Sequence, residues 1–288
     1  MSLSYVIISA VHNEEDYIRR TIECVVGQTV LPRKWVIVSD STDNTDAILG
    51  EYTAKYDWME LLRGPDHTDR NFSAMTKCVN LGYERIKHLS FDAVVKLDAD
   101  TTFDCDYFEF LLARLSENPQ LGIVGTYYID GAYDLSTNPY ADDEHVPGMC
   151  PVYRRGLFED LGGLPNVFCE NVFNVALAQI RGWHTRSFRE RKFAHHRRCG
   201  TYERNILQAR FDYGFRDYYC GNHPVWEIFR ALFQMRVGPY VIGGMMLYAG
   251  YLWGSVLRER APMPPEVFSH IRRRQLQRLW SSGKRLMK

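Results

Sequence analysis

Two aspartates, Asp98 and Asp100, follow the largely apolar segment 93–97 and are separated by one alanine. If this segment forms a strand, both carboxylates project from the same side of the backbone where the strand ends. Like charges held so close repel each other unless a cation lies between them or one of them takes up a proton. Carboxylate oxygens suit a hard divalent cation that also binds phosphate groups. The pair therefore predicts a metal and phosphate site, and the alternative is an ordinary acidic turn.

Two earlier apolar segments also end in polar residues. Segment 5–10 is followed by Asn13 and Glu14, and segment 35–38 is followed by a polar stretch that contains Asp40. The carboxyl ends of parallel strands meet at one edge of a sheet, and open α/β folds bind their ligands at that edge. Three polar strand ends at one edge predict a site for a nucleotide together with a metal ion.

The segments between these strands carry apolar residues at helical spacing. Alternating strands and helices over the first 125 residues predict an α/β fold with a doubly wound, mostly parallel sheet. Asn44 or Thr45 is expected to cap the second helix.

The polar segment 130–151 is predicted to be a loop, either a flexible lid or acceptor loop at the site or a plain surface loop. The expected strands cover residues 5–10, 35–38, 59–62, 93–97 and 123–126, and the expected helices cover residues 15–27, 45–56, 73–88, 107–117 and 170–182.

The charges are distributed unevenly along the 288 residues, although the net charge is zero. Residues 1–180 carry 14 basic and 28 acidic side chains, whereas residues 181–288 carry 21 basic and 7 acidic ones. A basic region of this size predicts an anionic partner, and because it has no RNA-binding or zinc-finger pattern, a lipid surface is favoured over nucleic acid.

The seven cysteines form no CxxC pair, and the amino terminus lacks a signal-peptide pattern. Both features predict a cytoplasmic protein with reduced thiols.

The region 201–288 is predicted to be helical, basic and rich in aromatic residues. Within it, residues 238–257 carry no charge and lie between Arg236 and Arg258. Twenty residues are just long enough to span a hydrocarbon core, but one proline and five glycines favour a helix at the membrane surface instead. Three arginines at 272–274 add attraction to anionic lipid. We therefore expect peripheral binding to the cytoplasmic face of a membrane, with a true span and a buried core helix as the alternatives.

The strand ends and the residues that follow them resemble the family-2 glycosyltransferases of the GT-A fold. Asn13 and Glu14 match the Asn-Glu pair after the family's first strand, and Asp98 and Asp100 match its DxD motif. The polar segment 39–45 corresponds to the family's Asp-Asp-Gly-Ser-x-Asp-x-Thr, with one acidic residue and the glycine missing. The resemblance implies an enzyme that transfers a sugar from a nucleotide donor.

The resemblance covers residues 4 to about 200 and implies a GT-A catalytic domain in residues 1–200. The composition of residues 201–288 separately predicts a helical, membrane-associating region. The resemblance also implies which residues bind the donor nucleotide, with Asp40 accepting a hydrogen bond from the uracil N–H and Asn80 lying nearby. The expected donor-binding residues are Ala10, Asn13, Glu14, Asp40, Arg70, Lys77, Asp98 and Ala99.

A bound Mn²⁺ or Mg²⁺ is a further implication of the resemblance, because such an ion neutralises the departing diphosphate. Asp100 is the expected metal ligand, and Asp98 is expected to contact the metal or the ribose. His195 or His196 is expected to be a further ligand, since Mn²⁺ accepts imidazole. The alternative is that the two histidines and the arginines after them bind phosphate or lie at the surface.

Glu170 and Asn171 match the family's Glu-Asp motif, in which the second carboxylate is generally the base that deprotonates the acceptor hydroxyl. Here the second residue is an amide, which cannot take up that proton. Three interpretations remain: Glu170 is the base, another group activates the acceptor, or the activity is lost. We favour Glu170, because its apolar neighbours raise the pKa of a carboxylate toward the range suited to a general base.

The resemblance thus implies an inverting, metal-dependent transfer, with a UDP-sugar as the favoured donor and a lipid-linked or polysaccharide acceptor. Because no convincing Gln-x-x-Arg-Trp motif of processive polymerases is present, transfer of a single sugar is favoured over polymerisation. A nucleotidyltransferase is one alternative, but it needs a basic, glycine-rich phosphate loop where segment 11–15 is acidic. A non-catalytic scaffold or partner subunit is the other, because Asn171 replaces the usual base.

Overall fold

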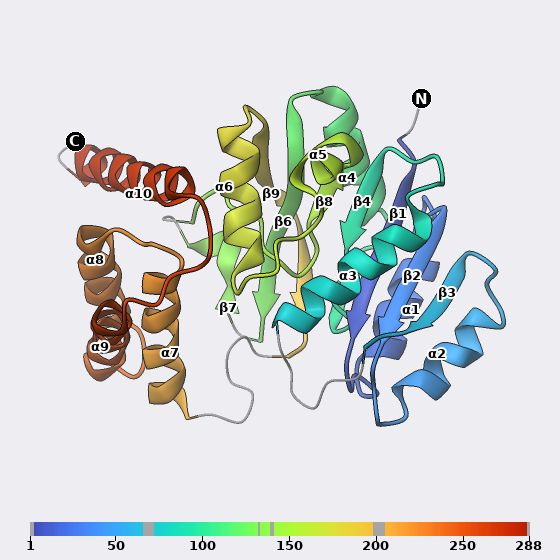
Figure 1. Cartoon of the computed structure of the whole chain (residues 1–288), viewed down its shortest axis with the longest axis horizontal. Coiled ribbons are helices and arrows are strands. Elements are labelled where there is room, and N and C mark those ends of the chain that lie inside the picture. Colours follow the sequence, from blue (N-terminus) through green and yellow to red (C-terminus); the bar gives the residue numbers. More distant parts are fainter. Residues whose placement is uncertain (1–2, 66–71, 132, 139–140, 198–204, 287–288) are drawn as a thin grey trace. The chain divides into compact units, whose positions relative to one another are not determined.

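The computed structural model describes residues 3–65, 72–131, 133–138, 141–197 and 205–286. The chain divides into two compact units, Met1–Arg197 and Arg198–Lys288 (Figure 1). The boundary that the sequence places after residue 200 falls among residues 198–204, outside the described residues.

The first unit is built on one sheet with helices on both faces. Its described residues form nine strands, in the order β3-β2-β1-β4-β8-β6-β9-β5, with β7 paired to β6. The strands are β1 (Tyr5–Val11), β2 (Lys34–Ser39), β3 (Met59–Arg63), β4 (Ala93–Lys96), β5 (Thr101–Phe103), β6 (Leu121–Asp130), β7 (Tyr133–Asp134), β8 (Val152–Arg154) and β9 (His184–His195). The helices are α1 (Ile18–Val26), α2 (Thr45–Thr53), α3 (Phe72–Ile86), α4 (Tyr107–Glu117), the short 3₁₀ helix η1 (Leu135–Thr137), α5 (Arg155–Leu161) and α6 (Glu170–Ile180).

The parallel part of the sheet brings the predicted polar strand ends together. β1 pairs in parallel with both β2 and β4, and β2 pairs in parallel with β3. Val11 lies opposite Ser39, and Ile8 lies opposite Lys96. The residues that follow β1, β2 and β4 therefore share one edge of the sheet, and the predicted α/β class is confirmed.

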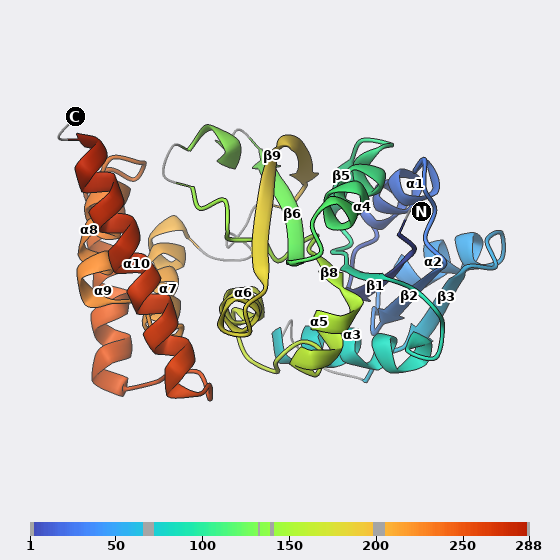
Figure 2. The same ribbon diagram turned by 90° about the horizontal axis from the view of Figure 1, so that it is seen from above.

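Alternate residues of β1 enter two separate cores. Tyr5 and Ile7 pack with residues of α1, α2 and α4, whereas Val6 and Ile8 pack with residues of α3, α5 and α6. Figure 2 shows α1 and α4 on one side of the sheet and α3 and α5 on the other. Because helices cover both faces, these strand residues are fully buried, which explains the near-continuous apolar sequence of the parallel strands.

The second half of the sheet is mixed, so the expectation of a mostly parallel sheet is wrong there. β8 runs antiparallel to β4 and β6, and β5 runs antiparallel to β9. β5 and β8 have only three residues each, too few to show a period in the sequence. β9 is rich in arginine, and its burial alternates only over its first four residues. These strands take their positions from pairing with neighbours rather than from a pattern of their own.

The segment 130–151, expected to be a loop, contains β7 and η1 in its described part. Asp143 fastens it to β9: its carboxylate pairs with Arg189 at 2.8 Å, and its carbonyl accepts a hydrogen bond from the Ser187 amide at 2.6 Å. The side-chain hydroxyl of Tyr127 also donates to this carboxylate. The contacts of Asp143 support a fixed wall at this position rather than a lid.

The second unit consists of α7 (Ile206–Tyr219), α8 (Pro224–Gln234), α9 (Ile242–Leu257) and α10 (Pro265–Leu286) in its described part, as the sequence predicts. α7 and α9 approach closely through glycines. A Cβ on Gly214 would lie 1.7 Å from the carbonyl oxygen of Leu247, and one on Gly250 would lie 1.9 Å from that of Phe211. Part of the uncharged stretch is therefore a tightly packed helix of this unit.

The longest uncharged helix is α9, with 16 residues. Among the described residues, no helix combines the length and the apolar character needed to cross a membrane.

Candidate functional site

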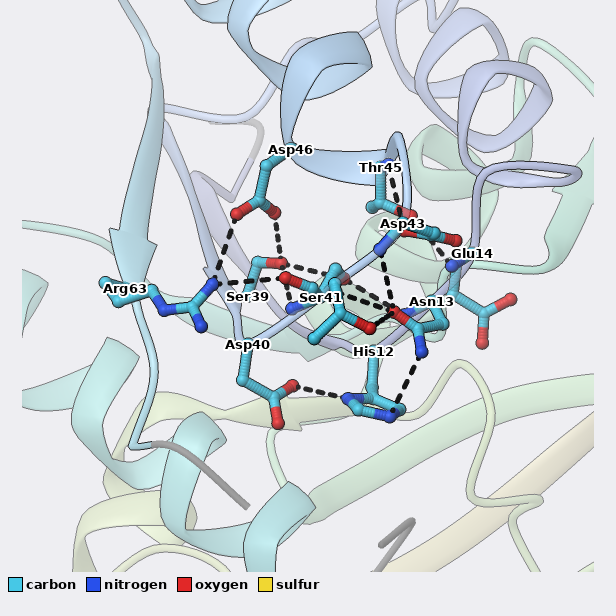
Figure 3. Close-up of polar contacts among 11 residues, drawn as sticks. His12, Asn13, Glu14, Ser39, Asp40, Ser41, Asp43, Thr45, Asp46 and Arg63 are labelled. Carbon is cyan, nitrogen blue, oxygen red and sulfur yellow. Dashed lines mark hydrogen bonds and ion pairs between the residues drawn. The ribbon is translucent and has the colours of Figure 1, made fainter. Parts of the chain in front are cut away.

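The loops after β1 and β2 are joined by Asn13 (Figure 3). Its backbone has φ of 53°, a left-handed conformation that asparagine tolerates better than most residues. Its side-chain oxygen accepts hydrogen bonds from the backbone amides of Thr42 at 2.8 Å and Asp43 at 3.3 Å. Its backbone amide donates to Ser41 Oγ at 3.0 Å. Asn13, an expected donor-binding residue, thus fixes the loop after β2 through its side-chain oxygen.

The start of α2 lies in the same network. Asn44 occupies the N-cap position, as predicted, but its side chain makes no cap hydrogen bond. Asp43 Oδ1 instead accepts a hydrogen bond from the Thr45 amide at 3.0 Å. Thr45 Oγ1 in turn accepts a hydrogen bond from the Glu14 amide at 2.8 Å, which fixes the loop after β1.

Glu14 and Asp40 are buried carboxylates at this edge of the sheet. Glu14 pairs with Arg197 at 2.7 Å, which ties the end of β1 to the chain just past β9. Asp40, with 3% of its side chain exposed, lies 3.0 Å from His12 Nδ1 (Figure 3). His12 was not predicted as a site residue. A histidine directly before Asn13 was the feature of the sequence that could have identified it.

Lys96 is the second missed residue, and it lies between two expected site carboxylates. Its ammonium is 2.8 Å from Asp98 Oδ1 and 3.8 Å from Glu170 Oε1, and it donates to the Gly148 carbonyl at 2.5 Å. Although burial by itself lowers the pKa of Lys96, the attraction of Asp98 and Glu170 outweighs burial and raises that pKa. Lys96 is therefore a buried cation. A lysine inside an apolar strand was the feature of the sequence that could have identified it.

Asp100 and His195 form a second pair. Their side chains are each 10% exposed and approach to 3.3 Å, because β5 and β9 pair with Thr101 opposite His195. Burial raises the pKa of Asp100, but its hydrogen bond to His195 and the charge of that ring outweigh burial and lower it. One carboxylate and one imidazole are donors that suit Mn²⁺. The described residues contain no group of three such side chains close enough to hold a metal, and Asp98 pairs with Lys96.

The second expected histidine ligand lies in a different environment. His196 Nε2 is 2.8 Å from Thr102 Oγ1, and its ring stacks on Tyr17 with the ring centres 6.2 Å apart. Burial and the charge of Arg20 lower the pKa of His196. Of the two histidines, His195 has its ring at the Asp100 carboxylate, whereas His196 donates its backbone amide to the Asp100 carbonyl at 2.9 Å.

Glu170 is the first residue of α6, and 5% of it is exposed. Burial raises the pKa of its carboxyl, Lys96 opposes this, and Asp98 adds to it, so that the net shift is upward. A Cβ on Gly148 would lie 3.4 Å from Glu170 Oε1 and 3.2 Å from Asn171 Cβ, so the loop before β8 packs directly on this pair. A buried carboxylate with a raised pKa can take up a proton near neutral pH.

The remaining expected donor-binding residues are placed as follows. Arg70 lies outside the described residues, and Lys77 is exposed on α3. Ala10 is half-buried near the end of β1, and the carbonyl of buried Ala99 accepts a hydrogen bond from Thr21 at 2.7 Å.

Asn80 of α3 bonds to the backbone of Leu164 with both groups of its amide, each at 2.9 Å. Because both groups of its side-chain amide are hydrogen-bonded, Asn80 fastens the segment between α5 and α6 to α3.

Residues 6–162 match the sequence profile of glycosyl transferase family 2. A poly-beta-1,6-N-acetyl-D-glucosamine synthase of Staphylococcus epidermidis is 29% identical over 120 residues, which are 40% of this chain and 26% of the synthase. The chain therefore matches only about a quarter of the length of this curated relative.

Two solved structures have similar folds. A mannosyltransferase from Pyrobaculum calidifontis, solved with GDP-Man and Mn²⁺, has a TM-score of 0.60 and 15% identity, over 99% of this chain and 81% of that one. S. aureus TarS 1–349, solved with UDP-GlcNAc, has a TM-score of 0.54 and 14% identity, over 73% of this chain and 65% of that one. At these identities the similarity establishes the fold.

Proposed function

The chain belongs to glycosyl transferase family 2, and we propose that it transfers one sugar, with inversion, from a UDP-sugar to an acceptor hydroxyl. The observation that carries this proposal is that Asp98 and Glu170 both lie close to the buried ammonium of Lys96. These contacts support one site that contains the aspartate of the donor motif and the carboxylate of the base motif.

The proposed reaction is one displacement. Glu170 takes up the proton of the acceptor hydroxyl, whose oxygen forms the new bond to the anomeric carbon. The bond from that carbon to the diphosphate breaks on the opposite face. Asp40, next to His12, accepts the uracil N–H. Asp100 and His195 would hold a divalent ion, which would neutralise the departing diphosphate.

Hydrolysis of a panel of UDP-, GDP- and dTDP-sugars tests this proposal. We expect Mn²⁺-dependent release of sugar from a UDP-sugar and its loss on addition of EDTA. Asp100→Asn should lower the rate by about 100-fold, since a ligand that neutralises the leaving diphosphate is removed. Asp104→Asn, at an exposed aspartate nearby, is the matched control and should leave the rate unchanged.

Two results of this assay would contradict the proposal. Absence of sugar release from every donor, without thermal stabilisation by UDP, would exclude a nucleotide-sugar site. Stabilisation by UDP and Mn²⁺ without any release would identify a non-catalytic scaffold.

We also propose that the second unit binds the cytoplasmic face of a membrane, where a lipid-linked or polysaccharide acceptor is presented. Support comes from one face of α8, whose buried side carries Glu227 and whose exposed side is apolar. The turn after α8 and the start of α9 also carry exposed apolar side chains, and exposed Arg236 in this turn complements anionic lipid. Between residues 225 and 245 the exposed large apolar side chains are Val225, Ile228, Phe229, Leu232, Phe233, Val237, Tyr240, Val241, Ile242 and Met245.

Co-sedimentation with liposomes containing phosphatidylglycerol tests the membrane proposal. The double variant Phe229→Glu/Leu232→Glu should lower the bound fraction at least about tenfold, because each side chain contributes on the order of 1.5 kcal/mol or more when buried in lipid. Leu31→Glu is the matched control, since Leu31 is 48% exposed and Leu232 is 52% exposed. Equal sedimentation of the double variant and the wild-type protein would exclude this surface.

A further inference from the structure

Lys96 ends β4 in a place where a charge is costly. Its neighbours Val95 and Leu97 are fully buried, and 5% of the Lys96 side chain is exposed. Removing an ammonium from water costs several kcal/mol unless opposite charges and hydrogen bonds compensate for it. Here the compensation comes from the DxD turn, the loop before β8 and the start of α6, which each bring one group to Lys96.

The distances around Lys96 are unequal. Its ammonium makes a hydrogen-bonded ion pair with Asp98 at 2.8 Å, whereas Glu170 lies 3.8 Å away. A direct hydrogen bond to Glu170 would stabilise the carboxylate further and make it a weaker proton acceptor. At the longer distance, the ammonium attracts the negative charge of Glu170 without that bond.

We propose that Lys96 is a positioning residue for sugar transfer, which holds the Glu170 carboxylate beside the donor motif and stabilises its negative charge. The inference rests on the proposed role of Glu170 as the base. Lys96 acts through Glu170 and Asp98 and needs no contact with the sugar. The carbonyl of Gly148 fixes the direction of the ammonium through its hydrogen bond at 2.5 Å.

Among the described residues, Lys96 and Asp98 are the charged side chains that shift the pKa of Glu170 most. Buried Tyr153 also interacts with Glu170, and its hydroxyl accepts a hydrogen bond from Asn174 at 3.2 Å. Burial raises the pKa of Tyr153 far above neutrality, so that this hydroxyl stays uncharged while Glu170 titrates. A change in the titration of Glu170 on replacing Lys96 therefore reports the loss of the ammonium.

The test is the pH profile of kcat for UDP-sugar turnover by Lys96→Met and Lys96→Arg. Loss of the positive charge raises the pKa of Glu170, so that the base stays protonated to higher pH. For Lys96→Met we expect kcat to fall at least about tenfold and the acidic limb of the profile to move up by about one pH unit or more. Lys96→Arg keeps the charge and should leave the acidic limb within about half a unit of its wild-type position.

Lys34→Met is the matched control, because Lys34 also pairs with a glutamate, Glu60 at 3.1 Å, at the other end of β2 from Asp40. It should leave kcat and its pH profile unchanged. If Lys96→Met does not fold, Lys96→Gln serves in its place, since it keeps a donor for Gly148 and removes the charge.

Two failures are distinguishable. If the wild-type protein turns over no nucleotide-sugar, the proposed function is wrong. If the wild-type protein is active and a neutral variant at Lys96 stays folded with an unmoved acidic limb, the positioning role alone is wrong, and Lys96 is only a structural ion pair.

Discussion

Replacing Glu170 with glutamine is expected to lower kcat by about 10³-fold, with UDP affinity changed by no more than about twofold. The substitution keeps the shape of the side chain and removes the group that takes up the acceptor proton. Glu170 is buried, and burial raises the pKa of its carboxyl above its usual value, which makes it a better proton acceptor. Steady-state turnover of a UDP-sugar, together with calorimetric titration of UDP, measures both quantities.

Two further variants make this result specific. Glu159→Gln, at a glutamate of α5 that pairs with Arg155 at 2.9 Å, is the control for a lost surface ion pair and should retain full activity. Asn171→Ala should lower kcat by about tenfold at most, because an amide does not accept the proton. If Glu170→Gln stays within about fivefold of wild type while Asn171→Ala loses activity, the base is not Glu170.

Replacing Gly250 with alanine is expected to destabilise the second unit by about 3 kcal/mol, the largest stability effect that we predict. The added methyl would lie 1.9 Å from the Phe211 carbonyl oxygen, so α7 and α9 must move apart along their contact. Hydrogen exchange of the α7 and α9 amides in the full chain measures the effect directly, as faster exchange of both helices.

Gly243 provides the control within the same helix. The nearest atoms to a Cβ on Gly243 belong to Pro239 at 3.4 Å, an ordinary contact. Gly243→Ala should therefore leave exchange unchanged or slow it slightly, since alanine favours helix over glycine by about 1 kcal/mol. Equal exchange in the Gly243 and Gly250 variants would show that the close approach of α7 and α9 does not stabilise this unit.

The sequence predicted the parallel half of the fold because its strands are long apolar segments. The segments between them carry apolar residues at helical spacing. The register of β1 with β2 and β4 then placed Asn13, Asp40 and Asp98 at one edge. β5 and β8 were not predictable, since a strand of three residues has too few positions for a pattern. Their places are set by pairing between segments that are distant in the chain.

Within the site, the sequence identified the types of residue better than their partners. The pairing of Asp98 with Lys96 depends on how β4, the loop before β8 and α6 pack together, which no local pattern contains. The same holds for Asn80, whose amide bonds to Leu164 rather than being available to a nucleotide. The family resemblance placed His195 or His196 in one site with Asp100, and the structure brings the ring of His195 to within 3.3 Å of that carboxylate.

The anomer of the first sugar released from an α-linked UDP-sugar tests the central claim most directly, because it reports donor cleavage and stereochemistry together. Real-time proton NMR in the presence of Mn²⁺ distinguishes the two anomers before they equilibrate in water. A single displacement assisted by Glu170 predicts that the β anomer appears first. Release of the α anomer first, or no release from any UDP-sugar, would contradict the account.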